Sequence, residues 1–150
     1  MKIGFWETLP ILQNKAEKEL SSSPFREKIF IEKVREEGVY DLVLCDKSYF
    51  PSHPSFESRI YLIPGSAHVP SPPEKGVLLT GGMNREDGVS FSSIGEKSAF
   101  LCLEREIFLG KKSIVPFETK VPFDRNFSLY KNIAWGFALA LITLFFTEEL

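Results

Sequence analysis

The residue types that could do chemistry in this sequence follow three apolar runs along the chain. Asp46 ends the run YDLVLCD, Ser66 and His68 follow RIYLI, and Thr80 and Asn84 follow GVLL. Because the carboxyl ends of parallel strands meet at one edge of a sheet, these side chains could line one crevice. An Asp, a His and a Ser in one cleft are the residue types of a hydrolase. The GxSxG nucleophile elbow is absent from the sequence, and turn or cap hydrogen bonds are the alternative role for these polar residues.

Two glycines, Gly81 and Gly82, directly follow Thr80 at the end of an apolar run. Glycine has no Cβ, so the backbone there can turn sharply, and exposed N–H groups at such a turn could hold an anion. Neither GxxxxGKS/T nor GxGxxG occurs in the sequence, and a tight turn explains the pair equally well. The predicted site is therefore a ligand-binding crevice without an assigned catalytic residue or cofactor, made of Asp46, Ser66, His68, Thr80, Gly81, Gly82 and Asn84.

Metal and redox chemistry have little support in the sequence. The two histidines, His53 and His68, are separated by a proline-rich stretch, with no carboxylate at ligand spacing. The two cysteines, Cys45 and Cys102, lie inside apolar runs, where free thiols pack as small hydrophobic side chains in a reducing compartment. We therefore predict no metal site and a cytoplasmic protein.

Composition predicts a globular chain with a mixed surface. The 150 residues are 43% hydrophobic and 25% charged, which suits a single domain over residues 1–150. The formal net charge is −2, with basic and acidic residues interspersed, so we expect no nucleic-acid partner. The first ten residues carry one lysine and no long apolar segment follows them, so we expect no secretory signal.

Hydrophobic periodicity predicts the elements that would position the crevice. Apolar runs predict parallel strands over Lys2–Trp6, Tyr40–Asp46, Arg59–Ile63 and Gly76–Leu79. Helical spacing predicts one helix over Thr8–Leu20, capped by Thr8, and another over Pro24–Glu37 that ends at Gly38, although Lys28–Val34 also fits a strand. Alternating patterns predict antiparallel strands over Val89–Ile94, Ala99–Leu109 and Ser113–Val121.

The C-terminal segment, Asn126–Leu150, contains the longest apolar run of the chain. Its uninterrupted part, Ile133–Phe146, is 14 residues long, whereas a bilayer span needs about 20. Small residues alternate there with bulky ones, as in a helix packed closely on a sheet. We therefore predict a buried helix, with a tail-anchored, membrane-associated protein as the alternative.

Four short motifs stand out in the C-terminal half: Leu79-Thr80-Gly81-Gly82, Asp87-Gly88-Val89, Tyr130-Lys131-Asn132-Ile133-Ala134 and Ala138-Leu139-Ala140-Leu141. In these motifs the C-terminal half resembles the last part of the central domain of Mur-ligase-type ATP-dependent peptide ligases. The resemblance implies a strand ending in a glycine turn, a β-meander and an alanine-rich helix. The glycine-rich phosphate loop with which that family binds ATP is missing after the first apolar run, so the resemblance implies a shortened domain without ligase activity.

These patterns together predict an α/β protein with a mostly parallel, Rossmann-like sheet flanked by helices, an antiparallel β-meander and a buried C-terminal helix. The leading functional hypothesis is a small non-enzymatic protein that associates with a protein partner or with itself, or a degenerate ligand-binding domain. Phe50 and Phe56, in a proline-rich loop, are the candidate contact residues, and their alternative role is to close over the sheet edge. An enzyme or ligand-binding protein that uses the crevice is the competing hypothesis.

Overall fold

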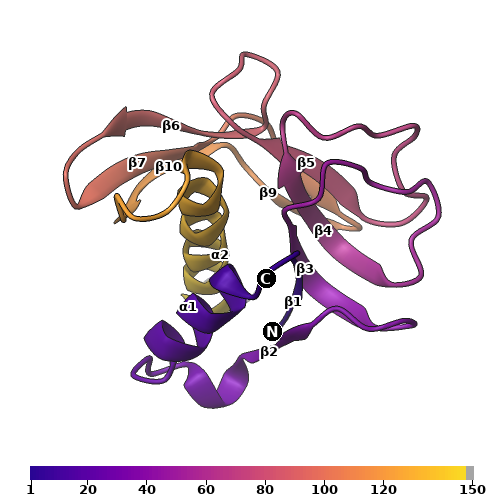
Figure 1. Ribbon diagram of the computed structural model, residues 1–150, viewed down its shortest axis with the longest axis horizontal. Helices are drawn as coiled ribbons and strands as arrows, with labels where there is room; N and C mark the ends of the chain where they lie inside the picture. The colour runs from indigo at the N-terminus through magenta and orange to yellow at the C-terminus, as the bar shows by residue number, and fades with distance from the viewer. Residues whose placement is uncertain (148–150) are drawn as a thin grey trace. The chain divides into compact units, whose positions relative to one another are not determined.

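The structure, a computed structural model, describes residues 1–147 (Figure 1). The end of the expected C-terminal segment, residues 148–150, lies outside this range. In the described residues the chain is α/β, with eight strands in a mostly parallel main sheet and two more in a small antiparallel sheet. Two compact units can be distinguished, Met1–Leu78 and Leu79–Leu150. The predicted α/β class and mostly parallel sheet are thus confirmed.

The first unit is built on a parallel sheet with the order β4-β3-β1-β2. Its strands are β1 (Lys2–Trp6), β2 (Phe30–Lys33), β3 (Val39–Cys45) and β4 (Glu57–Pro64). The apolar run of β3 is buried, as a strand with neighbours on both sides requires. The strands predicted over Lys2–Trp6, Tyr40–Asp46 and Arg59–Ile63 are confirmed, with bounds that differ by at most two residues.

The first helix begins later than predicted and has a different cap. It is α1 (Ile11–Leu20), and its buried face carries Leu12, Ala16 and Leu20. The Glu7 carboxylate accepts hydrogen bonds from the backbone N–H groups of Leu12 at 2.8 Å and Gln13 at 3.2 Å. These are donors that the start of a helix otherwise leaves unsatisfied. The predicted Thr8 cap is therefore wrong, and Glu7 takes that role.

The helix predicted over Pro24–Glu37 is wrong. A short 3-10 helix, η1 (Arg26–Lys28), is followed by β2, so Lys28–Val34 is mostly strand. The reason is tertiary, because β2 pairs in parallel with β1, from Lys2 opposite Phe30 to Phe5 opposite Lys33. Gly38 ends no helix. It lies against the ring of Tyr40, where a Cβ would approach the ring atoms Cε2 and Cζ to 2.6 and 2.8 Å.

The two phenylalanines of the proline-rich loop belong to the core of the first unit. Phe50 is fully buried and Phe56 is 5% exposed. The Phe50 ring lies 5.3 Å from the ring of Tyr61, and the Phe56 ring lies 5.3 Å from that of Trp6, both in edge-on contacts. The proposal that these side chains form a contact surface is therefore wrong, and the alternative role, closing over the sheet, is the observed one.

The second unit contains strands in both parallel and antiparallel pairs. Its strands are β5 (Val77–Gly81, whose first two residues belong to the first unit), β6 (Val89–Ile94), β7 (Ser98–Leu103) and β10 (Phe117–Pro122). β5 pairs with β6 in parallel, whereas β6 with β7 and β7 with β10 are antiparallel, as the predicted meander requires. The expected strand Ala99–Leu109 is interrupted at Glu104, and a separate hairpin forms from β8 (Ile107–Leu109) and β9 (Lys112–Ile114).

Helix α2 (Leu129–Thr147) packs on β6, β7 and β10 of the second unit. Seven consecutive residues, from Asn132 to Ala138, are buried, which agrees with the predicted buried helix. In the part of the chain that the structure describes, α2 is the single helix long and apolar enough to cross a membrane, by length and composition only. Just over half of its most apolar window, 56%, is buried inside the protein, as in the core helix of a folded domain.

Candidate functional site

The glycine turn after β5 is closed by a side chain of its own loop. Asp87 is buried, and its Oδ2 accepts a hydrogen bond from the backbone N–H of Asn84 at 3.0 Å. A Cβ on Gly82 would overlap this carboxylate, and a Cβ on Gly81 would lie 3.1 Å from Ile133 of α2. Both glycines therefore have packing roles. Because the carboxylate of Asp87 lies over the turn and already uses one of its N–H groups, this turn is poorly suited to hold an anion.

Three of the predicted crevice residues, Asp46, Ser66 and His68, lie in the first unit. Asp46 accepts hydrogen bonds from the Thr8 backbone N–H at 3.2 and 3.3 Å. Ser66 and His68 are exposed, and the His68 ring lies 5.8 Å from the ring of Tyr49. Asp46, Ser66 and His68 thus belong to one unit, whereas Thr80, Gly81, Gly82 and Asn84 belong to the other. A common crevice of the seven stays a prediction.

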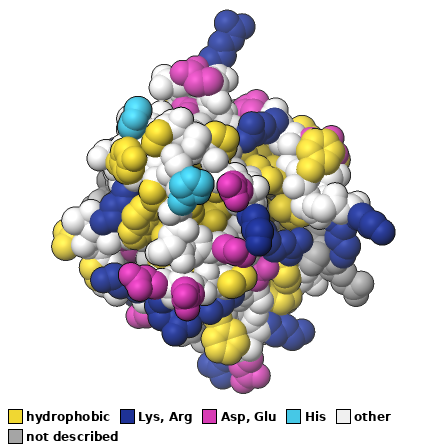
Figure 2. Space-filling view, turned by 90° about the vertical axis from the view of Figure 1, so that its right-hand side faces the viewer, with side chains coloured by type: hydrophobic (Ala, Val, Ile, Leu, Met, Phe, Trp, Pro, Cys, Tyr) yellow, Lys and Arg dark blue, Asp and Glu magenta, His cyan; other side chains and the backbone are white. Residues whose placement is uncertain are grey.

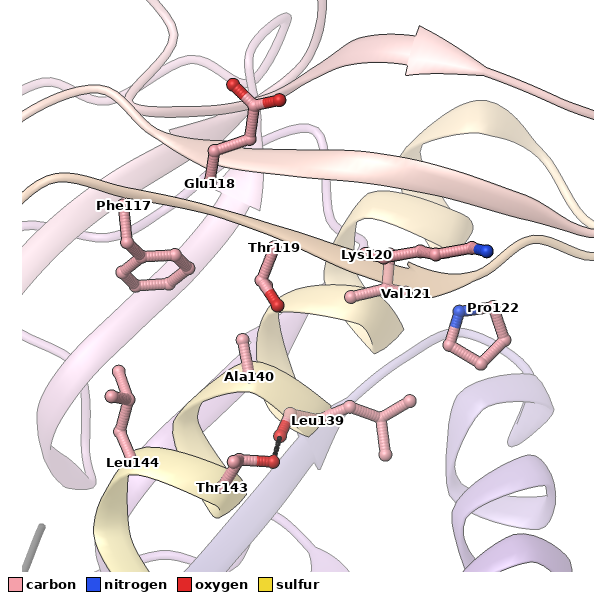
Figure 3. A pocket seen from close by; sticks show the side chains of 10 residues that line it. All are labelled: Phe117, Glu118, Thr119, Lys120, Val121, Pro122, Leu139, Ala140, Thr143 and Leu144. Carbon is pink, nitrogen blue, oxygen red and sulfur yellow. Dashed lines mark hydrogen bonds between the residues drawn. The ribbon is translucent and has the colours of Figure 1, made fainter. Parts of the chain in front are cut away.

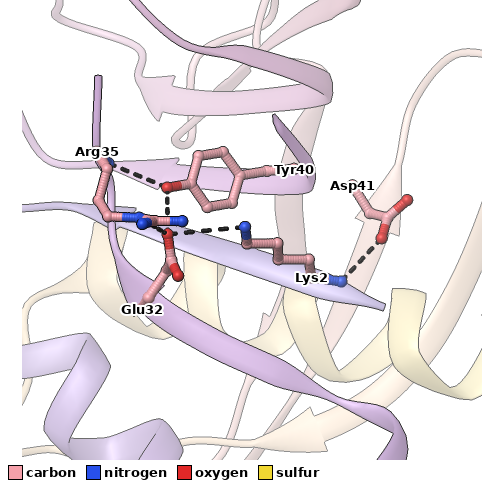
Figure 4. A network of polar contacts seen from close by, with 5 residues as sticks. All are labelled: Lys2, Glu32, Arg35, Tyr40 and Asp41. Carbon is pink, nitrogen blue, oxygen red and sulfur yellow. Dashed lines mark hydrogen bonds and ion pairs between the residues drawn. The ribbon is translucent and has the colours of Figure 1, made fainter. Parts of the chain in front are cut away.

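A polar network ties β2 to the rest of the first unit (Figure 4). The Tyr40 hydroxyl donates to Glu32 Oε2 at 2.7 Å and accepts from the Arg35 backbone N–H at 3.0 Å, while Arg35 Nε donates to the same Glu32 oxygen at 2.8 Å. Lys2 completes the network, with its Nζ 3.8 Å from Glu32 Oε2 and 5.0 Å from the centre of the Tyr40 ring. The backbone N–H of Lys2 also donates to Asp41 Oδ2 at 2.8 Å.

The electrostatics of this network favour a structural role. The hydrogen bonds from Tyr40 and Arg35 lower the pKa of Glu32, whereas burial, followed by the bond to Glu32, raises the pKa of Tyr40. Near neutral pH the carboxylate is therefore charged and the phenol protonated. A general base needs a pKa closer to neutrality, and a nucleophilic tyrosine needs a lowered one. The network holds a strand in place and has no reactive group.

The two thiols are equally unsuited to catalysis. Burial raises the pKa of Cys45 to about 12, so this thiol carries no thiolate character near neutral pH. Burial also raises the pKa of Cys102, whose Sγ lies 3.6 Å from Glu118 Oε2. Within residues 1–147, no three His, Cys, Asp or Glu side chains are grouped so that they could hold a metal ion.

The first unit contains a small hollow beside its proline-rich loops. It measures about 240 Å³ and includes His53, Phe56, Tyr61 and the salt-bridged pair Glu57 and Lys75, whose Oε1 and Nζ are 3.4 Å apart. Acidic and basic side chains are interspersed over the face in Figure 2, with no large area of one sign. The lining of the hollow also includes Glu74, so acidic and basic side chains are mixed in the hollow itself.

A second hollow lies between β10 and α2, inside the second unit (Figure 3). It measures about 210 Å³ and is lined by the whole of β10 and by Leu139, Ala140, Thr143 and Leu144 of α2. Phe117 and Thr119 point toward the helix, whereas Glu118 points away from it (Figure 3). The Thr143 hydroxyl donates to the carbonyl of Leu139 at 3.1 Å. Most of the surface that lines the hollow is apolar. We call it the β10–α2 groove.

β10 is an edge strand, so unpaired backbone groups lie beside this groove. It pairs with β7 on one side and, among the described residues, has no strand on the other. The Phe123 N–H donates to the Lys97 carbonyl at 2.9 Å, so in this antiparallel ladder the backbone groups of Phe117, Thr119 and Val121 point toward β7. Those of Glu118 and Lys120 consequently point outward along the free edge.

Two prolines limit this free edge. Pro122 occupies an outward-pointing position, where its missing N–H costs no bond to β7. Pro116 directly precedes the strand and, by the alternation along it, also occupies an outward-pointing position. The N–H donors available between them are those of Glu118 and Lys120. Sequence reasoning missed this site because Phe117–Pro122 was merged into a longer strand, and an edge position depends on the sheet order. The spacing of proline, charge, charge and proline at every second residue was the available signal.

Comparisons with protein-family models, with curated proteins and with solved structures found no match to this chain.

Proposed function

We propose that this is a non-enzymatic α/β protein that acts by binding another protein chain, which adds a strand to the free edge of β10. The observation that carries the proposal is the pair of outward N–H groups on Glu118 and Lys120 beside the β10–α2 groove. An added strand gains main-chain hydrogen bonds from such an edge, and a neighbouring pocket selects its side chains. Apolar lining from Phe117, Leu139 and Leu144 supplies that pocket.

The polar groups elsewhere support a binding role over catalysis. Asp87 closes its own turn, Glu32 and Tyr40 hold β2, and Glu7 caps α1. Each of these buried or half-buried groups stabilises the fold through hydrogen bonds within its own unit. None of them is positioned as an activated nucleophile with a base beside it, the arrangement expected of covalent catalysis.

The proposal includes the finer expectations from the sequence. The parallel order β4-β3-β1-β2, with α1 between β1 and β2, supports a Rossmann-like relationship for the first unit. The succession of glycine turn, antiparallel strands and helix in the second unit supports a distant relationship to the Mur-ligase central domain. Two buried free thiols support a reducing, cytoplasmic environment.

The proposal is tested by peptide selection on the immobilised protein. A displayed library of short extended peptides is selected against the wild type, and the enriched peptides are measured on two variants. Lys120→Pro removes one outward N–H without removing a bond to β7, and Lys120→Ala keeps that N–H. We expect Lys120→Pro to weaken peptide binding by about tenfold, because an edge hydrogen bond and its neighbours are lost, and Lys120→Ala to retain most of it.

Two outcomes would contradict this function. One is that no enriched peptide distinguishes Lys120→Pro from Lys120→Ala, while the chain stays monomeric and both variants melt near the wild-type temperature. The other is a saturable thermal shift with a nucleotide that Asn84→Ala abolishes. That result would favour the crevice near Asp46, Ser66, His68, Thr80 and Asn84 as the functional site.

A further inference from the structure

We propose that the partner of β10 is β10 of a second copy of this chain, paired antiparallel about a two-fold axis through Thr119. This inference rests on the proposed function, because it names the strand that occupies the free edge. In this register each pair of facing residues has numbers that add to the same sum, so Glu118 faces Lys120 of the other copy and Lys120 faces Glu118. A two-fold axis requires a surface that is complementary to itself, and this one is.

The charges of the free edge select this register. Glu118 and Lys120 are exposed and, two residues apart on one strand, lie on the same face of the sheet. Antiparallel pairing about Thr119 creates two facing pairs of opposite charge. A parallel arrangement in register would place Glu118 opposite Glu118 and Lys120 opposite Lys120, which is unfavourable. On the other face, Phe117 would lie opposite Val121, which extends the apolar surface of the β10–α2 groove.

The backbone donors fit the same axis. Glu118 and Lys120 direct their N–H and C=O groups outward. Glu118 of each copy would therefore form two backbone hydrogen bonds with Lys120 of the other copy, which gives two such pairs related by the axis. All four outward N–H groups of the two copies would then be used. Pro116 of one copy would face Pro122 of the other, where neither has an N–H to donate and the pairing ends. The prolines, the outward N–H donors and the charged side chains are therefore all arranged symmetrically about Thr119.

Charge reversal tests this register directly. The mass of the full chain is measured by sedimentation equilibrium across a concentration series, for wild type, Glu118→Lys, Lys120→Glu, and the double variant. We expect the wild type to dimerise and each single reversal to weaken the dimer by about tenfold, because both facing pairs become alike in charge. The double variant restores opposite charges and is expected to dimerise like the wild type. Mixing the two single variants creates complementary pairs and should recover a dimer.

Matched controls and a cross-link keep the test decisive. Glu96→Lys and Lys97→Glu make the same charge changes in the exposed turn between β6 and β7 and should leave the dimer unchanged. Thr119→Cys would place two thiols at a close, non-hydrogen-bonded facing pair, where mild oxidation should give a disulfide-linked dimer. Lys97→Cys, treated identically, should give none.

The outcomes separate this inference from the proposed function. A chain that stays monomeric throughout the series, or a mixture of the two single variants that does not recover the dimer, overturns self-pairing. Peptides that still bind at β10 in that case leave the proposed function standing. If the chain stays monomeric and no peptide distinguishes Lys120→Pro from Lys120→Ala, the proposed function falls as well.

Discussion

Gly136 of α2 faces Val121 of β10 so closely that a Cβ at Gly136 would lie 2.8 Å from Cγ2 of Val121. Real Cβ contacts are longer than this, so the missing side chain lets the helix approach the edge strand. Val121 is buried at this contact, whereas Thr143 and Leu144, further along α2, line the β10–α2 groove. The glycine therefore allows close packing of α2 on β10 at Val121, and this contact forms the base of the groove.

Gly136→Ala is expected to destabilise the protein by about 1 kcal/mol. The substitution gains up to about 1 kcal/mol of helix propensity, but overpacking against Val121 costs about 1–3 kcal/mol. Urea unfolding followed by circular dichroism measures the difference. In a Val121→Ala background the overlap is removed, so there the same substitution should be neutral or stabilising. An equal loss in both backgrounds would show that the close contact is not the cause.

Glu7→Ala is expected to lower the free energy of unfolding by about 1–2 kcal/mol, because the first-turn N–H groups of Leu12 and Gln13 lose their acceptor. Thr8→Ala, at the adjacent residue, is the matched control. The Thr8 hydroxyl is exposed and receives a 3.3 Å hydrogen bond from Lys47 Nζ, so its loss should change stability by less than about 0.5 kcal/mol. Thermal melts of both variants decide the matter. A larger loss of stability for Thr8→Ala than for Glu7→Ala would show that Thr8, as the sequence indicated, caps the helix.

The Tyr40–Glu32 hydrogen bond should make stability depend on acid pH. The pKa of Glu32 is lowered in the folded protein from the ordinary 4.5, chiefly by Tyr40. Its stabilising contribution is therefore complete above the unfolded-state pKa and is lost as the pH falls through the folded-state pKa. We expect Tyr40→Phe to cost about 1 kcal/mol near pH 7, and this cost to shrink progressively below pH 4.5.

Tyr61→Phe supplies the comparison for that experiment. The Tyr61 hydroxyl accepts from the Ser58 backbone N–H at 2.9 Å and donates to the Phe56 carbonyl at 3.4 Å, so its partners do not ionise. The loss of unfolding free energy caused by Tyr61→Phe, measured by urea unfolding at each pH, should stay constant between neutral and acid pH. If Tyr40→Phe shows the same flat profile, Glu32 does not carry the pH dependence.

Phe50→Ala is expected to destabilise the first unit strongly, by about 3–5 kcal/mol, because the ring is fully buried against Tyr61. Tyr49→Ala, one residue earlier and 52% exposed, should cost far less. Denaturant midpoints of the two variants give the comparison. A stable Phe50→Ala protein that had lost only a binding activity would instead support the surface role predicted for this loop.

Local patterns predicted the strands β1, β3 and β4 because each is an apolar run between turn residues. They failed at β2, since KIFIEKV satisfies both the helical and the strand period and only pairing with β1 decides between them. They also failed for Phe50 and Phe56, whose loop folds back over the sheet. The role of Gly82 depends on Asp87, five residues later, and the edge position of β10 depends on the order of all its neighbours. Contacts of this kind leave little trace in a single sequence.

Amide hydrogen exchange along β10 tests strand addition at this edge most directly. The N–H of Thr119 points toward β7 and should be protected at every protein concentration, whereas those of Glu118 and Lys120 point outward. We expect the exchange of Glu118 and Lys120 to slow as the concentration rises and a second copy pairs with β10. Rapid exchange at both positions at every concentration, with an unchanged rate after addition of a selected peptide, would contradict the account.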